Sequence, residues 1–558
     1  MNWRSRAVLQ RPEWTMHRAL YKSMGYSDDD LDRPLIAVAN SGNRIVPGHY
    51  NLDLVSDYVQ QGIRQAGGTP IEFGVIAACD GIAQGHEGMR YILPTRDLIA
   101  HDVELMVQAH RLDGVALLAS CDKIVPGMLM AAARLDLPAI MVVGGPMEGG
   151  CQFDDRAADT TSLTEGLGML QEGRITLYEY LQLEERATPT CGSCSFLGTA
   201  NTLCCVAEAL GMCLPHSATI PATWADRLRS AQAAGRRIVE LVREGLTARR
   251  IIRREGLENA VRLGAAIGGS TNLALHIPAI AYEAECDLNM DDFEALCRST
   301  PHLARIYPAA PANVPDFHAA GGVPAVMREL LPLLHGDALT VTSRTVADNV
   351  AGAARHDDER IIRPLARPWS AGGGLAVLRG NLAPASAITK PAAIHPDMQT
   401  FTGAARCFDS EEEANQAILA GQVRAGEVVV IRYEGPKGGP GMREMYISMK
   451  LLYGRGLALE TAVVTDGRFS GTNNGCFVGH VSPEAAEGGP LAVVQDGDRI
   501  TIDIPRRSLE LHVDAECMAA RRRAWQRPRP RVANGYLALY SRLAESADQG
   551  AVIRHRIE

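Results

Sequence analysis

The chain has 558 residues, 46% apolar and 22% charged, which allows two to four domains and excludes a disordered, collagen-like or coiled-coil protein. Its net charge of −9 argues against a nucleic-acid partner, since binding to phosphates requires a basic face. No apolar run approaches the length of a membrane span, and the first residues lack the apolar core of a signal peptide. We therefore expect a cytoplasmic protein without a membrane partner.

Residues 34 to 145 alternate between apolar runs and helical patterns. The apolar runs over 35–39, 74–78, 115–119 and 139–143 predict four strands, and residues spaced three and four apart predict helices between them. Pro126 is expected to open the helix after the third run. Near-continuous apolar strands joined by helices predict a parallel α/β sheet covered on both faces.

Polar residues follow three of these predicted strands. Asn40 ends the first, Asp80 follows the second, and Cys121, Asp122 and Lys123 follow the third. Ligands of open α/β sheets bind beyond the carboxyl ends of the strands. Asn-Ser and Asp-Gly are also ordinary turn formers, and for Asn40 we favour that interpretation. A charged pair directly after an apolar strand favours a function.

The pattern changes in the second half of the chain. Residues 150–360 are mainly helical in pattern, and a stretch rich in proline and glycine over 363–374 predicts a boundary. Beyond it, runs over 427–433, 462–465, 491–495 and 499–504 predict strands, with a hairpin turn at 496–498. We predict an α/β fold with a parallel-sheet domain over residues 1–365 and a β-rich, barrel-like domain over residues 366–558.

Thirteen cysteines are spread over the chain, which is typical of packing residues, metal ligands or catalytic thiols in a reducing compartment. Cys191 and Cys194 form a Cys-x-x-Cys motif, which zinc knuckles, redox motifs and chance all produce. No second close pair with the spacing of a zinc site follows in the sequence. With Cys121 at a strand end, an iron–sulfur cluster is the better interpretation, because thiolates are its usual ligands.

Hard oxygen donors stand on three separate loops, as a Mg²⁺ site requires: Asp80, Asp122 and Glu444. Each alone is more often a solvated carboxylate. Glu444 ends a glycine-dense loop over 434–444, where the backbone can approach a ligand closely. Ser470 follows another strand, and His480 lies ten residues on, but the Gly-x-Ser-x-Gly elbow of hydrolases is missing. A hydrolase is therefore a weak interpretation.

Seven motifs in order along the chain resemble the dihydroxy-acid dehydratase / phosphogluconate dehydratase family, which includes sugar-acid dehydratases. They cover residues 79–89, 121–128, 191–194, 268–272, 435–444, 466–471 and 480–486. The resemblance implies an iron–sulfur and Mg²⁺ dependent hydro-lyase that converts a 2,3-dihydroxy carboxylic acid into a 2-keto acid. Its partner would be this small hydroxy acid, and the protein would form a homodimer or homotetramer.

Site residues carried over from the resemblance are specific. Cys121 and Cys194 would ligate the cluster, whose iron would act as a Lewis acid on the C3 hydroxyl. Ser470 would be the base that takes the C2 proton. The Mg²⁺ ion would bind the substrate carboxylate and C2 hydroxyl, held by Asp80, Asp122, Glu444 and Lys123. Lys123 can be carbamylated in this family, which turns a poor Mg²⁺ ligand into one with anionic oxygens.

Gly48 departs from the family pattern, because many members carry a cluster cysteine in this loop. Glycine cannot ligate iron, so the third thiolate would come from elsewhere. Cys191 is the first candidate and Cys79 the second. The cluster is then either a [2Fe–2S] or a [4Fe–4S] cluster, and members with Pro-Gly-His in this loop are linked to the latter.

The substrate remains open between an acid of the 2,3-dihydroxyisovalerate type and an aldonate. Asn473 and Asn474 could hydrogen-bond the extra hydroxyls of a sugar acid, or could simply form a turn. The glycine in place of a cluster ligand also motivates a non-catalytic, metal-binding relative. A remote alternative is a zinc hydrolase that uses Cys191, Cys194 and His480.

Overall fold

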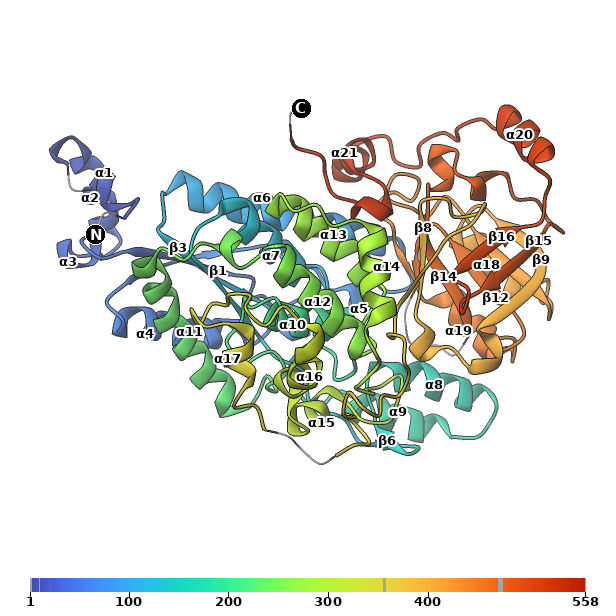
Figure 1. The fold of residues 1–558 in the computed structure, drawn as a ribbon, viewed down its shortest axis with the longest axis horizontal. Coiled ribbons are helices and arrows are strands. Elements are labelled where there is room, and N and C mark those ends of the chain that lie inside the picture. The colour runs from blue at the N-terminus through green and yellow to red at the C-terminus, as the bar shows by residue number, and fades with distance from the viewer. Residues whose placement is uncertain (1–2, 10, 355–357, 470–474, 557–558) are drawn as a thin grey trace.

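The computed structural model describes the chain except for residues 1–2, 10, 355–357, 470–474 and 557–558. It has an N-terminal part with a parallel sheet and many helices, and a C-terminal part built around strands (Figure 1). A short arm precedes the first sheet, with helices α1 (Arg6–Leu9), α2 (Thr15–Ser23) and α3 (Asp28–Leu31). None of the helices in the described ranges combines the length and apolar character of a membrane span.

The N-terminal sheet has four parallel strands in the order β2-β1-β3-β4. Their bounds are β1 (Leu35–Asn40), β2 (Thr69–Gly74), β3 (Gly114–Ala119) and β4 (Ala139–Val143). Every residue of β1, β3 and β4 is buried, which explains why their sequences are nearly continuous apolar runs. The parallel α/β prediction is confirmed.

The second strand was predicted in the wrong place. It covers Thr69–Gly74, and the apolar residues 75–78 leave the sheet after Val75 N–H donates to Asn40 O (2.8 Å). As an edge strand, β2 alternates between half-buried and exposed residues over 71–74 and does not need an apolar run. The stretch after it is an irregular connection in which Ile76 is 43% exposed.

Helices cover both faces of this sheet. On one side α4 (Leu52–Gln65) packs on α11 (Ala225–Glu244), and on the other α6 (Ile92–Ala109) packs on α7 (Ile124–Leu135). Pro126 is the third residue of α7 rather than the first. The glycines Gly62 and Gly235 let α4 and α11 touch, because a Cβ on either would come within 2.1 Å of the other helix's backbone.

The N-terminal part contains further helices outside this sheet. They are α5 (Asp80–Ala83), α8 (Thr160–Gln171), α9 (Leu177–Arg186), α10 (Thr199–Ala209), α12 (Arg254–Ala266), α13 (Leu273–Ala284), α14 (Met290–Ser299), α15 (Val314–Ala319), α16 (Gly322–Leu330) and α17 (Val346–Val350). A two-stranded ribbon joins β5 (Gln152–Phe153) to β6 (Arg156–Ala157).

The C-terminal sheet has eight strands in the order β16-β15-β9-β10-β12-β14-β8-β7. They are β7 (Ala376–Leu378), β8 (Ser386–Thr389), β9 (Thr400–Phe408), β10 (Glu427–Ile431), β12 (Ala462–Thr465), β14 (Cys476–Ser482), β15 (Arg499–Asp503) and β16 (Ser508–Leu511). Arg379 joins the two edges: its N–H donates to Arg507 O (3.0 Å), and its carbonyl accepts from Leu509 N–H (2.8 Å). The predicted barrel-like domain is confirmed.

Two local predictions in this part were wrong. Residues 491–495 do not form a strand; Pro490 opens a short 3-10 helix that ends at Val493. Residues 496–498 form a turn that leads into β15 but does not join two strands; β15 instead forms a hairpin with β16, the next strand, and pairs with β9 on its other side. The apolar run is explained by burial, because residues 491–494 pack into the core of the barrel.

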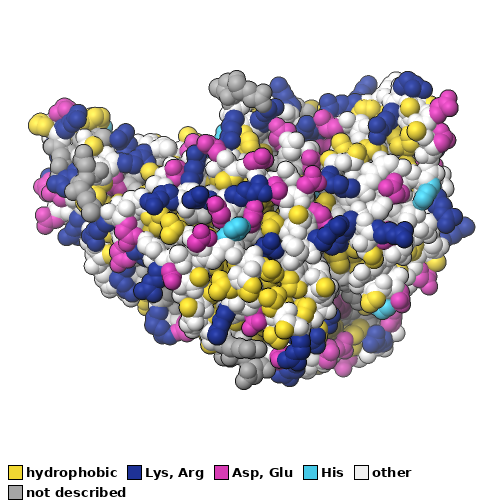
Figure 2. All heavy atoms as spheres, viewed as in Figure 1, with side chains coloured by type: hydrophobic (Ala, Val, Ile, Leu, Met, Phe, Trp, Pro, Cys, Tyr) yellow, Lys and Arg dark blue, Asp and Glu magenta, His cyan; other side chains and the backbone are white. Residues whose placement is uncertain are grey.

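The C-terminal part also contains elements outside the eight-stranded sheet. They are α18 (Glu411–Leu419), β11 (Glu444–Met445), α19 (Ile447–Gly454), β13 (Arg468–Phe469), α20 (Ala515–Ala524) and α21 (Gly535–Leu543). After α21 the chain returns to α6, where Ile553 N–H donates to Asp97 (2.9 Å) and Arg96 donates to Ala551 O (3.1 Å). The space-filling view of one face shows acidic and basic side chains interspersed over both parts (Figure 2).

Candidate active site

A cavity of about 410 Å³ lies where the carboxyl edge of the parallel sheet meets the barrel. Figure 1 shows α5, which begins at Asp80, at this junction. The cavity walls bring together four predicted site residues from both halves of the sequence: Asp80, Cys121, Cys194 and Glu444. Because strands β1, β2 and β3 are parallel, the loops that follow them converge on this wall.

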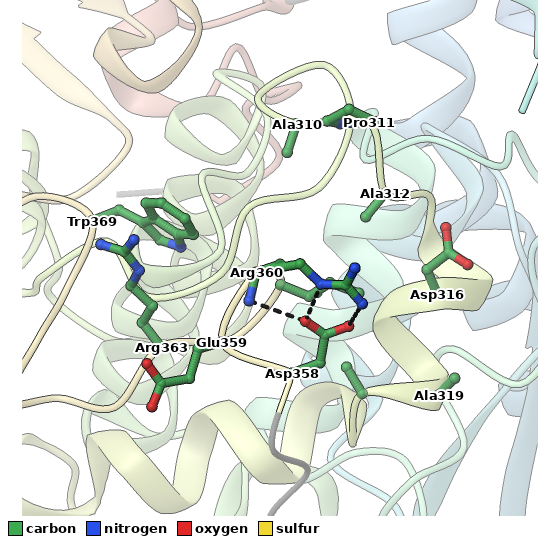
Figure 3. A pocket seen from close by; sticks show the side chains of 12 residues that line it. Ala310, Pro311, Ala312, Asp316, Ala319, Asp358, Glu359, Arg360, Arg363 and Trp369 are labelled. Carbon is green, nitrogen blue, oxygen red and sulfur yellow. Dashed lines mark hydrogen bonds and ion pairs between the residues drawn. The ribbon is translucent and has the colours of Figure 1, made fainter. Parts of the chain in front are cut away.

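A larger hollow of about 1170 Å³ contains none of the predicted site residues. In Figure 3 the Arg363 guanidinium lies over the ring of Trp369, 3.3 Å from its centroid, and Arg360 pairs with Asp358 (2.8 Å). The acidic and thiol groups needed for the predicted chemistry gather in the smaller cavity instead. We therefore place the candidate active site there.

Cys121 is held by a histidine that the sequence analysis did not identify. The N–H groups of Ser120 and Cys121 donate to His49 Nε2 (3.1 and 3.0 Å), and His49 Nδ1 lies 2.9 Å from Ser41 O. Burial lowers the pKa of His49 to about 4, so the ring is neutral and its Nδ1–H donates to the Ser41 carbonyl. His49 therefore fixes the turn that aims Cys121 into the cavity.

The Cys-x-x-Cys motif is clamped against the loop after β4. Gly192 has a φ of +140°, and a Cβ there would lie 2.3 Å from Met147 N. Ser193 N–H donates to Gly145 O (3.0 Å), and Asn201 donates to the carbonyl of Cys194. This clamp places Cys194 in the cavity wall, whereas Cys191 does not line the cavity.

Cys79, the second candidate for a third thiolate, does line the cavity, on the loop between β2 and α5. Burial, followed by the carboxylate of Asp80, raises the pKa of both Cys121 and Cys194 well above the ordinary value, and Cys79 adds to both shifts. Such thiols ionise only beside a strong positive charge, as when they ligate a metal. The three thiols therefore fit an iron–sulfur cluster chemically.

The acidic residues lie beside a buried lysine. Lys123 Nζ donates to Asp122 (2.7 Å), and both side chains are almost completely buried. Burial and the neighbouring Asp122 raise the pKa of Asp80; burial also opposes the ionisation of Asp122, but Lys123 lowers its pKa to about 2. Two adjacent buried carboxylates favour a bound cation.

Lys123 itself has the character that carbamylation requires. Burial and the Arg468 guanidinium lower its pKa and so favour the neutral amine, which is the form that reacts with carbon dioxide. Among the described residues, no three His, Cys, Asp or Glu side chains converge on one point as they stand. The donor set fits Mg²⁺ when a carbamate on Lys123 adds oxygen donors to the carboxylates.

Glu444 reaches the cavity from the second half of the chain. Its Oε2 accepts hydrogen bonds from Arg468 (2.8 Å) and from the side-chain amide of Asn272 (3.1 Å). Asn272 ends the 268–272 motif and is the N-cap residue of α13, so the start of this helix helps to orient Glu444. A side chain of the N-terminal part thus positions an acid of the C-terminal part.

Two further acidic residues of the family motifs, Asp466 and Glu484, hold a loop in place. Asp466 accepts the N–H groups of Tyr433, Glu434 and Ala485, and Glu484 accepts those of Lys437 and Gly438. Burial raises the pKa of Asp466 to about 6 and that of Glu484 to about 7. Together they hold the glycine-rich 434–444 loop, at whose end Glu444 stands.

Two family models match almost the whole chain. The model of the dihydroxy-acid/6-phosphogluconate dehydratase N-terminal domain matches residues 33–349, and that of the C-terminal domain matches residues 360–551. The chain belongs to this family. Similar proteins named dihydroxy-acid dehydratase occur in Acetivibrio thermocellus (49% identical) and Ignicoccus hospitalis (51% identical), each alignment covering at least 98% of both chains. That of Pyrococcus furiosus is 48% identical over 99% of this chain.

Membership of this dehydratase family makes the protein an enzyme and confirms the predicted resemblance. The predicted base Ser470 lies outside the described residues, as do Asn473 and Asn474. Phe469, directly before Ser470, lines the cavity. Neither Cys191 nor His480 lines the cavity. Within the described residues, the three zinc ligands of the hydrolase alternative are therefore not brought together.

Proposed function

We propose that this protein dehydrates 2,3-dihydroxy acids with a short branched alkyl chain, such as 2,3-dihydroxyisovalerate, to 2-keto acids. The observation that carries the proposal is the single cavity shared by the thiols Cys121 and Cys194 and the acids Asp80 and Glu444. The names of the similar proteins support the same reaction.

The walls of the cavity support an alkyl chain over the polyol chain of an aldonate. Much of the lining is apolar, with contributions from Ile82, Met147, Phe196, Leu197 and Phe469. Each additional hydroxyl of a sugar acid would lose its hydrogen bonds to water on entering this wall. The hydroxyl groups of Thr161, Thr164 and Tyr446 also line the cavity, so it is the large apolar share of the lining that favours the branched acid.

Cys121, Cys194 and Cys79 would hold the iron–sulfur cluster, and Mg²⁺ would be held by Asp80, Asp122, Glu444 and carbamylated Lys123. Such groups, when bound, supply a Lewis acid for the C3 hydroxyl and positive charge beside the carboxylate and C2 hydroxyl. We retain both [2Fe–2S] and [4Fe–4S] as cluster types.

The remaining steps would be carried out by side chains of the protein. Ser470, as its alkoxide, would take the C2 proton; the C3 oxygen would leave as hydroxide and take up one proton, so that one proton is removed, one is returned and water is released. The enol that remains tautomerises to the 2-keto acid. A serine hydroxyl acts as a base only where positive charge stabilises its alkoxide, and Arg468, two residues earlier, brings a guanidinium to this wall beside Glu444.

The test is a metal analysis combined with a substrate panel. Protein purified anaerobically is expected to be brown, to contain iron, sulfide and magnesium, and to form 2-keto acid from 2,3-dihydroxyisovalerate faster than from gluconate or arabinonate. Faster turnover of an aldonate would replace the substrate proposal, and a metal-loaded protein inactive on all three would favour the non-catalytic alternative. Sedimentation analysis of the same sample tests the proposed homodimer or homotetramer.

A further inference from the structure

Lys390 is a buried lysine in the wall of the active-site cavity that no motif of the sequence analysis contains. It follows β8 and precedes a 3-10 helix at Pro391–Ala393, so it enters the cavity from the barrel. Only 3% of its surface is exposed. The residues around it are held on both sides: the Thr389 hydroxyl donates to Phe477 O (2.7 Å), and Lys390 O accepts from Ala393 N–H (3.0 Å).

The ammonium group of Lys390 has no partner among the described residues. The chain contains only five lysines, and the other four are accounted for. Three form ion pairs, which are Lys22–Asp28, Lys123–Asp122 and Lys437–Glu487, and Lys450 lies over the ring of Tyr446. For Lys390, by contrast, the structure gives no hydrogen bond or ion pair of Nζ within the described ranges, although it is the most enclosed of the five together with Lys123.

An enclosed cation without a counter-charge is costly unless a ligand supplies the missing charge. Burial lowers the pKa of Lys390 to about 8, so most of the amine remains protonated at pH 7. The nearby His302 cannot supply the counter-charge, because an imidazole is either neutral or positively charged; burial and Arg305 lower its pKa to about 4, so the ring is neutral. The negative charge must therefore come from the content of the cavity.

We propose that the Lys390 ammonium binds the carboxylate of the substrate and makes a carboxylic acid, rather than a neutral diol, the accepted ligand. This inference rests on the proposed function for the identity of the substrate. A carboxylate has two oxygens with several acceptor positions. One oxygen can therefore lie toward the cation that the acidic residues would hold, while the other accepts a hydrogen bond from the Lys390 ammonium. Because charge moves onto the carboxylate as the C2 proton leaves, the same contact strengthens during the reaction.

The test compares a charged ligand with its neutral analogue. 2-Hydroxyisovalerate lacks the C3 hydroxyl and cannot be dehydrated, and 2-hydroxyisovaleramide has nearly the same shape without the charge. Binding of both to the metal-loaded enzyme is measured by calorimetry under anaerobic conditions. We expect Lys390→Met to weaken binding of the acid about 10- to 100-fold, as for a lost hydrogen bond to a charged group, and to leave amide binding unchanged.

Two further variants make the result specific. Lys390→Arg retains a cation and should recover part of the affinity for the acid, whereas Lys22→Met, which removes an exposed lysine paired with Asp28 in the N-terminal arm, should change nothing. Methionine fills the space of the lysine stem, so iron and magnesium content and the melting temperature should stay at the wild-type values in Lys390→Met.

Equal weakening of acid and amide, unchanged binding of the acid, or loss of metal from Lys390→Met would each overturn the proposal. The proposed function can fail separately: a wild-type enzyme that binds 2-hydroxyisovalerate through Lys390 but forms no 2-keto acid from 2,3-dihydroxyisovalerate would disprove the reaction and leave the carboxylate contact intact. In kinetics, the KM for 2,3-dihydroxyisovalerate should rise and kcat should fall in Lys390→Met.

Discussion

A Cβ atom on Gly48 would lie 2.4 Å from the Sγ of Cys121, and 3.1 Å from the backbone nitrogen of Ser193. Gly48 is therefore the point at which the loop after β1 touches both cysteine-bearing loops of the cavity. Any side chain here, including that of a cysteine, requires Cys121 to move. The close approach leaves no room for a cysteine side chain at position 48 while Cys121 stays in place, so the proposed third thiolate would have to come from another loop.

Gly48→Ala should therefore damage the site even though it adds a single methyl group. We expect a loss of about 1–3 kcal/mol in stability, as for other overpacked interiors, and a lower iron content because Cys121 is displaced. Thermal unfolding and iron analysis measure the two effects. Gly74→Ala, at a position with nothing within 4 Å of the added Cβ, is the matched control. Equal iron content in both variants would show that the cavity tolerates the methyl group.

Cys79→Ser and Cys191→Ser should differ in their effect on the cluster. Only Cys79 lines the cavity with Cys121 and Cys194. We expect Cys79→Ser to lose iron and the visible absorption of thiolate-bound iron, and Cys191→Ser to keep both. Iron analysis and absorption spectra of anaerobic samples make the comparison. A colourless Cys191→Ser protein beside a brown Cys79→Ser protein would make Cys191 the ligand.

Gly441→Ala should weaken the contact between the glycine-rich loop and the N-terminal part. Gly441 has a φ of +87°, and a Cβ there would lie 1.9 Å from the carbonyl oxygen of Arg90. The added strain and clash should cost about 2–4 kcal/mol and shift Glu444, three residues later, which lowers magnesium content. Gly454→Ala adds a Cβ in open space and should be neutral. Melting temperatures and magnesium contents of the Gly441→Ala and Gly454→Ala proteins test this prediction, and equal values in the two variants would contradict it.

Stability should fall as the solution becomes acidic, between pH 6.5 and pH 4. Burial, followed by Arg305, lowers the pKa of His302 from 6.5 to about 4. In this window the unfolded chain binds a proton that the folded protein excludes, so the stability present above pH 6.5 is lost at about 1.4 kcal/mol per pH unit for each such group. His302→Asn should reduce the slope by one proton. Melting temperatures across this range test it, and an unchanged slope would contradict the assignment.

Most strands of the N-terminal sheet can be predicted from the sequence because they are buried. Strands β1, β3 and β4 are covered on both faces, so their residues form unbroken apolar runs. The edge strand β2 has one more exposed face and no unbroken apolar run, so the prediction placed the strand at the apolar residues 74–78 instead. The meeting of Asp80 and Cys121 was also predictable, because the carboxyl ends of neighbouring parallel strands share one edge.

Other parts of the site depend on contacts between residues far apart in the chain. His49 holds the turn at Cys121, Asn272 orients Glu444, and Lys390 enters from the barrel. The spacing of Cys191 and Cys194 suggested a shared role, but the clamp at Ser193 turns only one of them toward the cavity. Local patterns specify strands and turns because these arise from neighbouring residues. Which side chains face one another is decided by how the two sheets pack, and only the folded chain contains that information.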